Sequence, residues 1–354
     1  LSAVSDIGLT AALVCRHFGI VDGGNVPAEL DPRGEFTGMN VLAQRAPLAV
    51  TAAAAGLEPQ EVNDWVSDAL GRLRQTRLAR PRPHRDDKVV TAWNGLMISA
   101  FARGDGAAAA ARAAEFIRRE LHDPSSGVLF RAYRGGRGKV EGFAEDYAFL
   151  IQGLLDLYEA AFDPGWLQWA ERLQRKMDEL FWDSEGGGWF TSGPAHTGVL
   201  LRLKQEYDGA EPASNSVAAL NGLRLAAMLH AEEYRTRALR ALEAFRPRWT
   251  AAPQALPEML CALELALEPP RHVVLAGDPA AEDFRALAAV VREVHGPWRA
   301  LLAADGGAGQ AWLATRAPWL AAIAPREGRA AAYVCENFTC QAPVTSVGEL
   351  RTLL

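Results

Sequence analysis

The sequence is poor in cysteine, has no apolar run of roughly 18 residues, and contains no block rich in lysine and arginine. Four cysteines in 354 residues are too few for a disulfide scaffold, which favours the cytoplasm and leaves secretion open. The short apolar runs exclude a membrane-spanning helix, and a net charge of −6 argues against nucleic acid and membranes as partners. Because the chain begins at Leu1 without a leader, we expect a fragment or a processed chain.

Several enzyme motifs are also missing. The sequence has no GxGxxG, GxxxxGK[ST], HExxH or GxSxG pattern, so nothing in it predicts a cofactor. No histidine or cysteine cluster completes a metal site around Cys335 and Cys340, so no metal is predicted either. Two ordinary thiols are the favoured interpretation of this cysteine pair, and a redox pair or a disulfide is the alternative. Only His84 and His196 lie near the polar segments considered below, both in expected loops.

A unit of two helices and a turn repeats between about residues 90 and 268. The segment "HDPSSGVLFRA" (122–132) resembles "WDSEGGGWFTS" (182–192), and Asp183 follows Asp123 by 60 residues. Repeats of this period indicate stacked helical hairpins. The first helix of each pair is apolar on all sides and the second is one-sided, which indicates an inner and an outer layer. We therefore predict a mainly α fold, an (α/α) toroid with helices at 93–103, 107–122, 145–161, 165–182, 215–230 and 231–246, and a fourth unit from Pro257.

The two ends of the chain differ from this repeat. Residues 18–42 are rich in glycine, proline and aspartate and predict a long shaped loop or a short hairpin, and residues 59–80 have the periodicity of an amphipathic helix. After Pro269 and Pro270, short β-type runs alternate with helical segments. We expect two domains, a toroid portion over 1–268 and a small α/β unit over 269–354.

Polar and aromatic residues cluster where three of the expected inner helices begin. Inner helices of a toroid run in the same direction, so we expect these clusters to meet around one opening. The residues are Trp93 and Asn94 for the first helix, Glu145, Asp146 and Tyr147 for the second, and Tyr207, Asp208, Glu211 and Asn215 for the third.

Such an opening suits carbohydrate chemistry, because two carboxylates about 5–10 Å apart can act on a glycosidic bond as acid and base. Asp146, together with Asp208 or Glu211, is the candidate catalytic pair. A saccharide would stack on Trp93, Tyr147 and Tyr207 and hydrogen-bond to Asn94, Glu145 and Asn215.

Each of these residues also has a purely structural interpretation. Glu145 and Asp146 suit a helix N-terminus, and Asn215 with Ser216 is a good N-cap. Trp93 suits a buried position as well as a ligand contact. The two tyrosines suit hydrogen bonds between hairpins.

The chain resembles the spermatogenesis-associated protein 20 family in "DDKVVTAWNGLMISAFA", "EDYAFLIQGLLDLYEA", "WLQWAERLQRKMDELFWDSEGGGWF" and "DGAEPASNS". "HFGIVDGGNVPAELDPRGEFTGMNVL" and "AYVCENFTCQAPV" fit it too. The resemblance implies a toroid of the six-hairpin glycosidase type, incomplete here and without the family's N-terminal thioredoxin-like domain. The family's "EPSGNS" reads "EPASNS" here, which affects the local turn.

The resemblance implies a fertility-related role in animals and no assigned activity, and it suggests carbohydrate handling by analogy of fold alone. We therefore expect a carbohydrate-active or sugar-binding protein whose partner is a small saccharide. The alternative is a non-catalytic interaction module of a thioredoxin-like redox protein.

Overall fold

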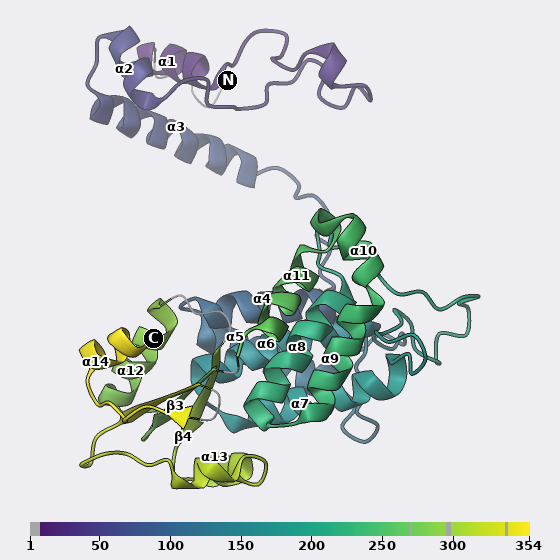
Figure 1. Cartoon of the computed structure of the whole chain (residues 1–354). Coiled ribbons are helices and arrows are strands. Elements are labelled where there is room, and N and C mark those ends of the chain that lie inside the picture. The colour runs from purple at the N-terminus through teal and green to yellow at the C-terminus, as the bar shows by residue number, and fades with distance from the viewer. Residues whose placement is uncertain (1–7, 270, 295–298, 337–338) are drawn as a thin grey trace. The chain divides into compact units, whose positions relative to one another are not determined.

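The computed structural model describes residues 8–269, 271–294, 299–336 and 339–354 and divides the chain into two compact units, 1–86 and 87–354. The domain boundary expected at 268/269 falls inside the second unit. Figure 1 shows a predominantly helical chain with a small sheet near its C-terminal end. Within the described residues, none of the helices combines the length and the apolar character needed to cross a membrane.

The described residues of the first unit form three α-helices and a short 3-10 helix, and the α-helices pack around a small apolar core of residues such as Val14, Val62 and Val66. The expected amphipathic helix is confirmed as the last of them. Residues 18–42 form a shaped loop, as expected, in which the Asp31 carboxylate accepts hydrogen bonds from the backbone of Glu35 and Phe36. The elements are α1 (Leu9–Phe18), η2 (Ala28–Leu30), α2 (Leu48–Ala55) and α3 (Pro59–Leu78).

The second unit begins with the predicted helical hairpins, so the fold class is confirmed (Figure 1). Contacts join α4, α6, α8 and α11 into an inner row, and α5, α7 and α9 each pack on the preceding inner helix. This is an arc of an (α/α) toroid. The bounds are α4 (Thr91–Arg103), α5 (Ala107–Glu120), α6 (Ala144–Ala161), α7 (Pro164–Phe181), α8 (Ser214–Leu229), α9 (Glu232–Ala244), α10 (Arg246–Ala251), η3 (Pro253–Ala255) and α11 (Pro257–Leu267).

Two glycines allow the inner helices α4 and α6 to pack backbone to backbone. A Cβ on Gly95 would lie 2.5 Å from the backbone of Phe149 and Leu150, and a Cβ on Gly153 would lie 2.6 Å from the Gly95 carbonyl oxygen. Because real Cβ atoms do not approach so closely, glycine is required at both positions. This explains why Gly95 occurs in the second turn of a helix.

The repeated turn has the same geometry in both copies. The Asp123 N–H donates to the Val128 carbonyl oxygen and the Asp183 N–H to that of Gly188, both at 2.9 Å. Each turn ends in an isolated bridge, His122 with Leu129 and Trp182 with Trp189. In the first turn, Arg131 and its neighbours continue into β2 (Ala132–Tyr133), which pairs antiparallel with β1 (Val89–Val90) just ahead of α4.

A four-stranded sheet with helices forms the predicted C-terminal α/β portion. Its strand order is β4-β3-β5-β6, with β3 and β4 parallel and the other neighbours antiparallel. Side chains alternate between the two faces: Val274 and Leu302 pack into the core of the helical hairpins, and Val273 and Leu275 pack with α12 and α14. The elements are β3 (Arg271–Ala276), α12 (Glu282–Glu293), β4 (Arg299–Ala304), α13 (Ala308–Ala314), η4 (Pro318–Ala322), β5 (Ala331–Glu336), β6 (Thr339–Cys340) and α14 (Val347–Leu353).

The two C-terminal cysteines form a disulfide. Cys335 on β5 and Cys340 on β6 lie directly opposite each other in an antiparallel pair, which brings their sulfur atoms within bonding distance. The favoured interpretation as two ordinary thiols was wrong, because the two cysteines lie on two strands, β5 and β6, that pair with each other. Cys15 and Cys261 are free thiols.

Candidate functional site

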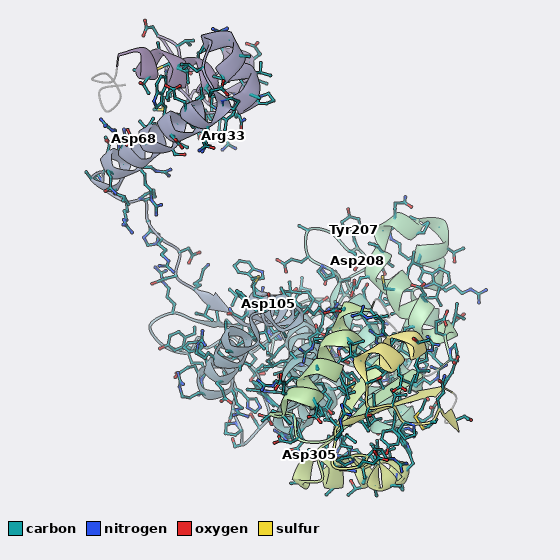
Figure 2. The ribbon with its side chains drawn as sticks, turned by 90° about the vertical axis from the view of Figure 1, so that its left-hand side faces the viewer. Arg33, Asp68, Asp105, Tyr207, Asp208 and Asp305 are labelled. Carbon is teal, nitrogen blue, oxygen red and sulfur yellow. A yellow bond between two sulfur atoms is a disulfide. The ribbon has the colours of Figure 1, made fainter. Side chains whose placement is uncertain are left out.

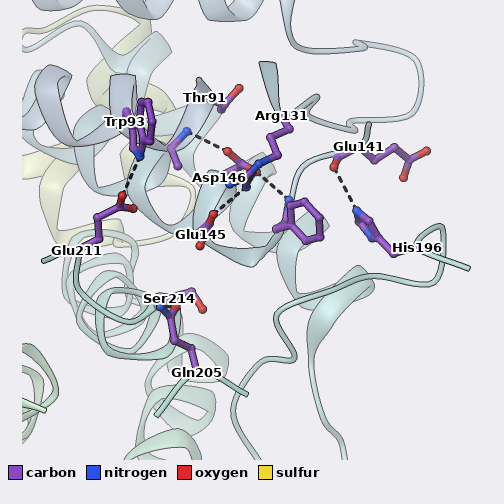
Figure 3. Close-up of polar contacts among 12 residues, drawn as sticks. Thr91, Trp93, Arg131, Glu141, Glu145, Asp146, His196, Gln205, Glu211 and Ser214 are labelled. Atoms are coloured by element: carbon purple, nitrogen blue, oxygen red, sulfur yellow. Dashed lines mark hydrogen bonds and ion pairs between the residues drawn. The ribbon is translucent and has the colours of Figure 1, made fainter. Parts of the chain in front are cut away.

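The polar residues at the leading ends of the inner helices include one exposed aromatic side chain that is held in place. Trp93, in the first turn of α4, is 53% exposed, so the buried interpretation of this residue was wrong. Its indole Nε1–H donates a 2.8 Å hydrogen bond to Glu211 Oε1, on the loop that leads into α8 (Figure 3). Two segments 118 residues apart therefore meet here, as the sequence predicted. Tyr207 lies on the same loop beside Asp208 (Figure 2). Its side chain is 58% exposed.

Asp146 lies at the same end of α6 but is fully buried. Its Oδ1 accepts a hydrogen bond from the Ala92 N–H at 2.9 Å, and its Oδ2 accepts one from the Phe143 N–H at 2.8 Å, so it caps α6 and fixes the start of α4 (Figure 3). Burial raises the pKa of Asp146 to about 7, although Arg131 and the backbone donors act to lower it. The capping interpretation of Asp146 is confirmed, and its position is that of a residue that organises two helix ends.

Glu145, next to Asp146, is only partly exposed. Arg131 Nη1 donates to Glu145 Oε1 at 2.7 Å and to Asp146 Oδ2 at 3.2 Å, so one guanidinium joins both carboxylates. The same guanidinium lies 4.9 Å from the centre of the Phe143 ring, and His196 stacks on that ring at 4.2 Å. Arg131 thus supports the outer edge of this end of the toroid.

Four further predicted site residues make hydrogen bonds within the fold. Asp208 accepts from the N–H groups of Ala213 at 2.6 Å and Glu258 at 2.9 Å, which ties the loop before α8 to the start of α11. Asn215 does not cap α8; its amide pairs with both backbone groups of Trp189. The buried Tyr147 hydroxyl accepts from the Leu129 N–H, and Asn94 Nδ2 donates to the Val90 carbonyl oxygen. The interpretation of Tyr147 as a residue that hydrogen-bonds between hairpins is therefore confirmed.

A second polar region lies deeper, among the inner helices. A cavity of about 500 Å³ is bounded by α4, α6, α8 and α11 and, on its other side, by α12 and β4. Its charged lining residues in the described part of the chain are Arg103, Asp156, Glu159, Arg224, Glu258, Arg292 and Arg299. None of these residues was predicted from the sequence to belong to a site.

An ion-pair network spans one wall of this cavity. Asp156 accepts from Arg103 Nε at 2.9 Å and from Arg224 Nη2 at 2.8 Å, and the Ser99 hydroxyl also donates to it. Burial alone would raise the pKa of Asp156, but Arg224 and Arg103 outweigh it and hold this pKa below its usual value. Glu159 accepts from the same Arg224 nitrogen at 3.1 Å, yet burial raises its pKa above the usual value.

Glu258, in the first turn of α11, lies half-buried on another wall. Burial, and then the nearby charge of Asp208, raises its pKa. One signal for it was present in the sequence, because "PEMLCALELAL" opens the fourth inner helix as the other clusters open the first three. The described residues contain no group of three or more histidine, cysteine or acidic side chains placed to hold a metal ion.

Comparison with known proteins places the chain among named relatives, and no family model matches it. Human spermatogenesis-associated protein 20 is 42% identical over 358 residues, which cover 97% of this chain and 45% of the human protein. The mouse protein of the same name is 42% identical over 359 residues with the same coverage. An uncharacterised Caenorhabditis elegans protein is 34% identical over 364 residues, 96% of this chain and 48% of the worm protein. The chain therefore spans about half the length of these relatives.

Solved structures that align with this chain have low sequence identity and low TM-scores. A family 105 glycoside hydrolase from C. acetobutylicum aligns over 57% of this chain and 61% of its own, with 10% identity and a TM-score of 0.36. A GH76 α-mannanase from Bacteroides thetaiotaomicron aligns over 74% of this chain and 67% of its own, with 13% identity and a TM-score of 0.29. The sequence relatives are much nearer, and over nearly its whole length this chain is homologous to part of spermatogenesis-associated protein 20, as its motifs predicted.

Proposed function

We propose that the helical toroid portion of the chain binds a saccharide at the opening where the inner helices α4, α6 and α8 begin. The observation that carries the proposal is Trp93, an aromatic side chain 53% exposed whose ring is oriented by the Glu211 hydrogen bond. An exposed indole held in one orientation offers a flat apolar face at little cost in side-chain entropy. Tyr207 supplies a second exposed ring, and Glu145 and Glu211, both partly exposed, supply acceptors for sugar hydroxyls.

Binding fits this geometry better than turnover. Both oxygens of Asp146 and of Asp208 accept backbone hydrogen bonds, so these carboxylates position the helix ends. A role for Asp146 or Asp208 as acid or base would require one of these backbone bonds to be given up during the reaction, whereas the hydrogen bond of Glu211 joins its Oε1 to the Trp93 indole.

Titration calorimetry with a panel of neutral mono- and oligosaccharides tests the proposal. Trp93→Ala should weaken binding about tenfold or more, because it removes the stacking face. Met97→Ala is the matched control, since Met97 lies one turn further along α4 and is 52% exposed. The absence of binding to any saccharide, or equal losses in both variants, would reject the proposal.

One observation favours the alternative, an interaction module. Trp93, Met97 and Phe101 lie four residues apart on one face of α4, and all three are about half exposed. Such spacing suits the apolar face of a helix from a partner protein. Met97→Asp and Phe101→Asp should then abolish capture of the partner while saccharide titrations of these variants stay unchanged. Saccharide binding that depends on Trp93 alone would instead favour the first proposal.

A further inference from the structure

We propose that the cavity bounded by α4, α6, α8, α11, α12 and β4 is a binding site for a small organic oxyanion, such as a carboxylate- or phosphate-bearing polyol. The cavity is distinct from the exposed Trp93 surface, and the proposal does not depend on saccharide binding there. At about 500 Å³, its volume falls within the range of small-molecule sites.

Charge on the walls favours an anion. Four guanidinium groups line the cavity, from Arg103, Arg224, Arg292 and Arg299, against three carboxyl groups, so the balance is 4 − 3 = +1 when all are ionised. Asp156 is held ionised by Arg224 and Arg103, whereas the pKa values of Glu159 and Glu258 are raised by burial. Any protonation of these two glutamates makes the cavity more positive.

Two buried polar atoms of the lining residues have no hydrogen-bond partner within the described part of the chain. Among the described residues, Arg224 Nη1 and Gln152 Oε1 are buried without a hydrogen-bond partner. A buried guanidinium N–H without an acceptor is costly, and a ligand oxygen that reaches it would recover that energy. The amide of Gln152 would serve a hydroxyl of the same ligand. Guanidinium groups recognise carboxylate and phosphate by paired, charge-assisted hydrogen bonds.

The cavity is open to solutes at its edge, and it contains a natural reporter. The side chain of Arg103 is 61% exposed. Cys261, a half-buried free thiol, lies on the α11 wall of the cavity. Cys15, the other described free thiol, lies on α1 in the first unit. A ligand in the cavity should shield Cys261 and leave Cys15 unaffected, so each experiment carries its own control.

The test is the rate of N-ethylmaleimide labelling of each cysteine in the full chain, followed by peptide mass spectrometry. Glucose 6-phosphate, gluconate and glucose share a six-carbon skeleton and differ in the anionic group, and sodium chloride balances ionic strength. Glucose 6-phosphate or gluconate should slow Cys261 labelling on the order of tenfold at ten times its Kd, since the ligand-free fraction falls by the factor 1 + [L]/Kd. The more protective of the two identifies phosphate or carboxylate as the preferred group.

Two variants assign the effect to the wall charges. Arg224→Gln should abolish protection, and because this change also breaks the pairs with Asp156 and Glu159, circular dichroism must confirm folding. Glu258→Gln removes a carboxylate for which the described residues show no side-chain hydrogen bond, and it should strengthen protection on the order of fivefold. Trp93→Ala should leave protection unchanged.

Several results would overturn the proposal. The first two are Cys261 labelling at the same rate with and without either anion, and slowing of Cys15 labelling by as much as that of Cys261. The others are protection of Cys261 by glucose as strong as by the anions, and protection that is weaker in Glu258→Gln than in the parent protein. The Glu258 variant keeps the test decisive if Arg224→Gln does not fold.

Discussion

The opening of the toroid and the cavity among its inner helices use polar residues in opposite ways. At the opening, the carboxylates of Asp146 and Asp208 are occupied by backbone N–H groups, and the exposed groups are a tryptophan and a tyrosine. In the cavity, side chains pair with side chains, and one arginine nitrogen and one amide oxygen have no partner among the described residues.

This difference separates residues that build the fold from residues that are available to a ligand. A carboxylate whose two oxygens each accept a backbone hydrogen bond stabilises the helix ends it joins. A buried network of charged side chains contributes little net stability relative to apolar packing, so its presence suggests another use.

The largest loss of stability is expected from a substitution in the cavity wall. Asp156→Asn leaves Arg224 without its main counter-charge in a buried position, and it should lower the free energy of unfolding by about 3–5 kcal/mol. Urea denaturation followed by tryptophan fluorescence measures it, since Trp65 alone among ten tryptophans lies in the first unit. Glu115→Gln breaks an exposed pair with Arg118 on α5 and should cost less than about 0.5 kcal/mol. Equal losses would remove the distinction between buried and exposed pairs.

A smaller, pH-dependent change in stability is expected from Asp146, at the opening of the toroid. The pKa of Asp146 is raised from 3.8 to about 7 in the folded state, so the folded protein holds this proton more tightly than the unfolded chain. The resulting stabilisation is complete below the unfolded pKa and is lost as the pH rises through about 7. Between about pH 5 and pH 7 the loss from this group should be roughly 2–3 kcal/mol.

Asp146→Asn should remove this component of the pH dependence. Denaturation midpoints of both proteins, measured at several pH values across that interval, give the difference directly. Parallel curves for the two proteins would show that Asp146 does not titrate there.

The smallest effect on stability is expected from the exposed pair. Glu211→Gln retains an acceptor for the Trp93 indole and removes one surface charge, so the free energy of unfolding should change by less than about 0.5 kcal/mol. A loss of more than about 2 kcal/mol by the same denaturation assay would place Trp93 and Glu211 with the groups that build the fold.

Most of the fold follows from local pattern. The repeat of Asp123 and Asp183 fixed the hairpin order, and apolar periodicity gave the inner helices to within a few residues. The strand β4 (Arg299–Ala304) was missed, because its apolar run is short and pairs with a strand more than twenty residues earlier in the chain. The Cys335–Cys340 disulfide depends on a hairpin register that spacing alone does not determine.

The site was less predictable because its partners are distant in sequence. Convergence of Trp93 with Glu211 followed from the toroid, but the burial of Asp146 depends on Ala92 and Arg131, which belong to other elements. The cavity had an overlooked signal. Asp156 and Arg224 interrupt otherwise apolar inner helices, and a charge in such a position must find a partner.

A crystal structure of the full chain grown with glucose 6-phosphate or gluconate, whichever protects Cys261 more strongly, tests the central claim most directly. The account predicts the ligand between α6, α8 and β4, with its anionic group within hydrogen-bonding distance of Arg224 Nη1. Clear density for the ligand elsewhere on the protein, with this cavity empty, would contradict it.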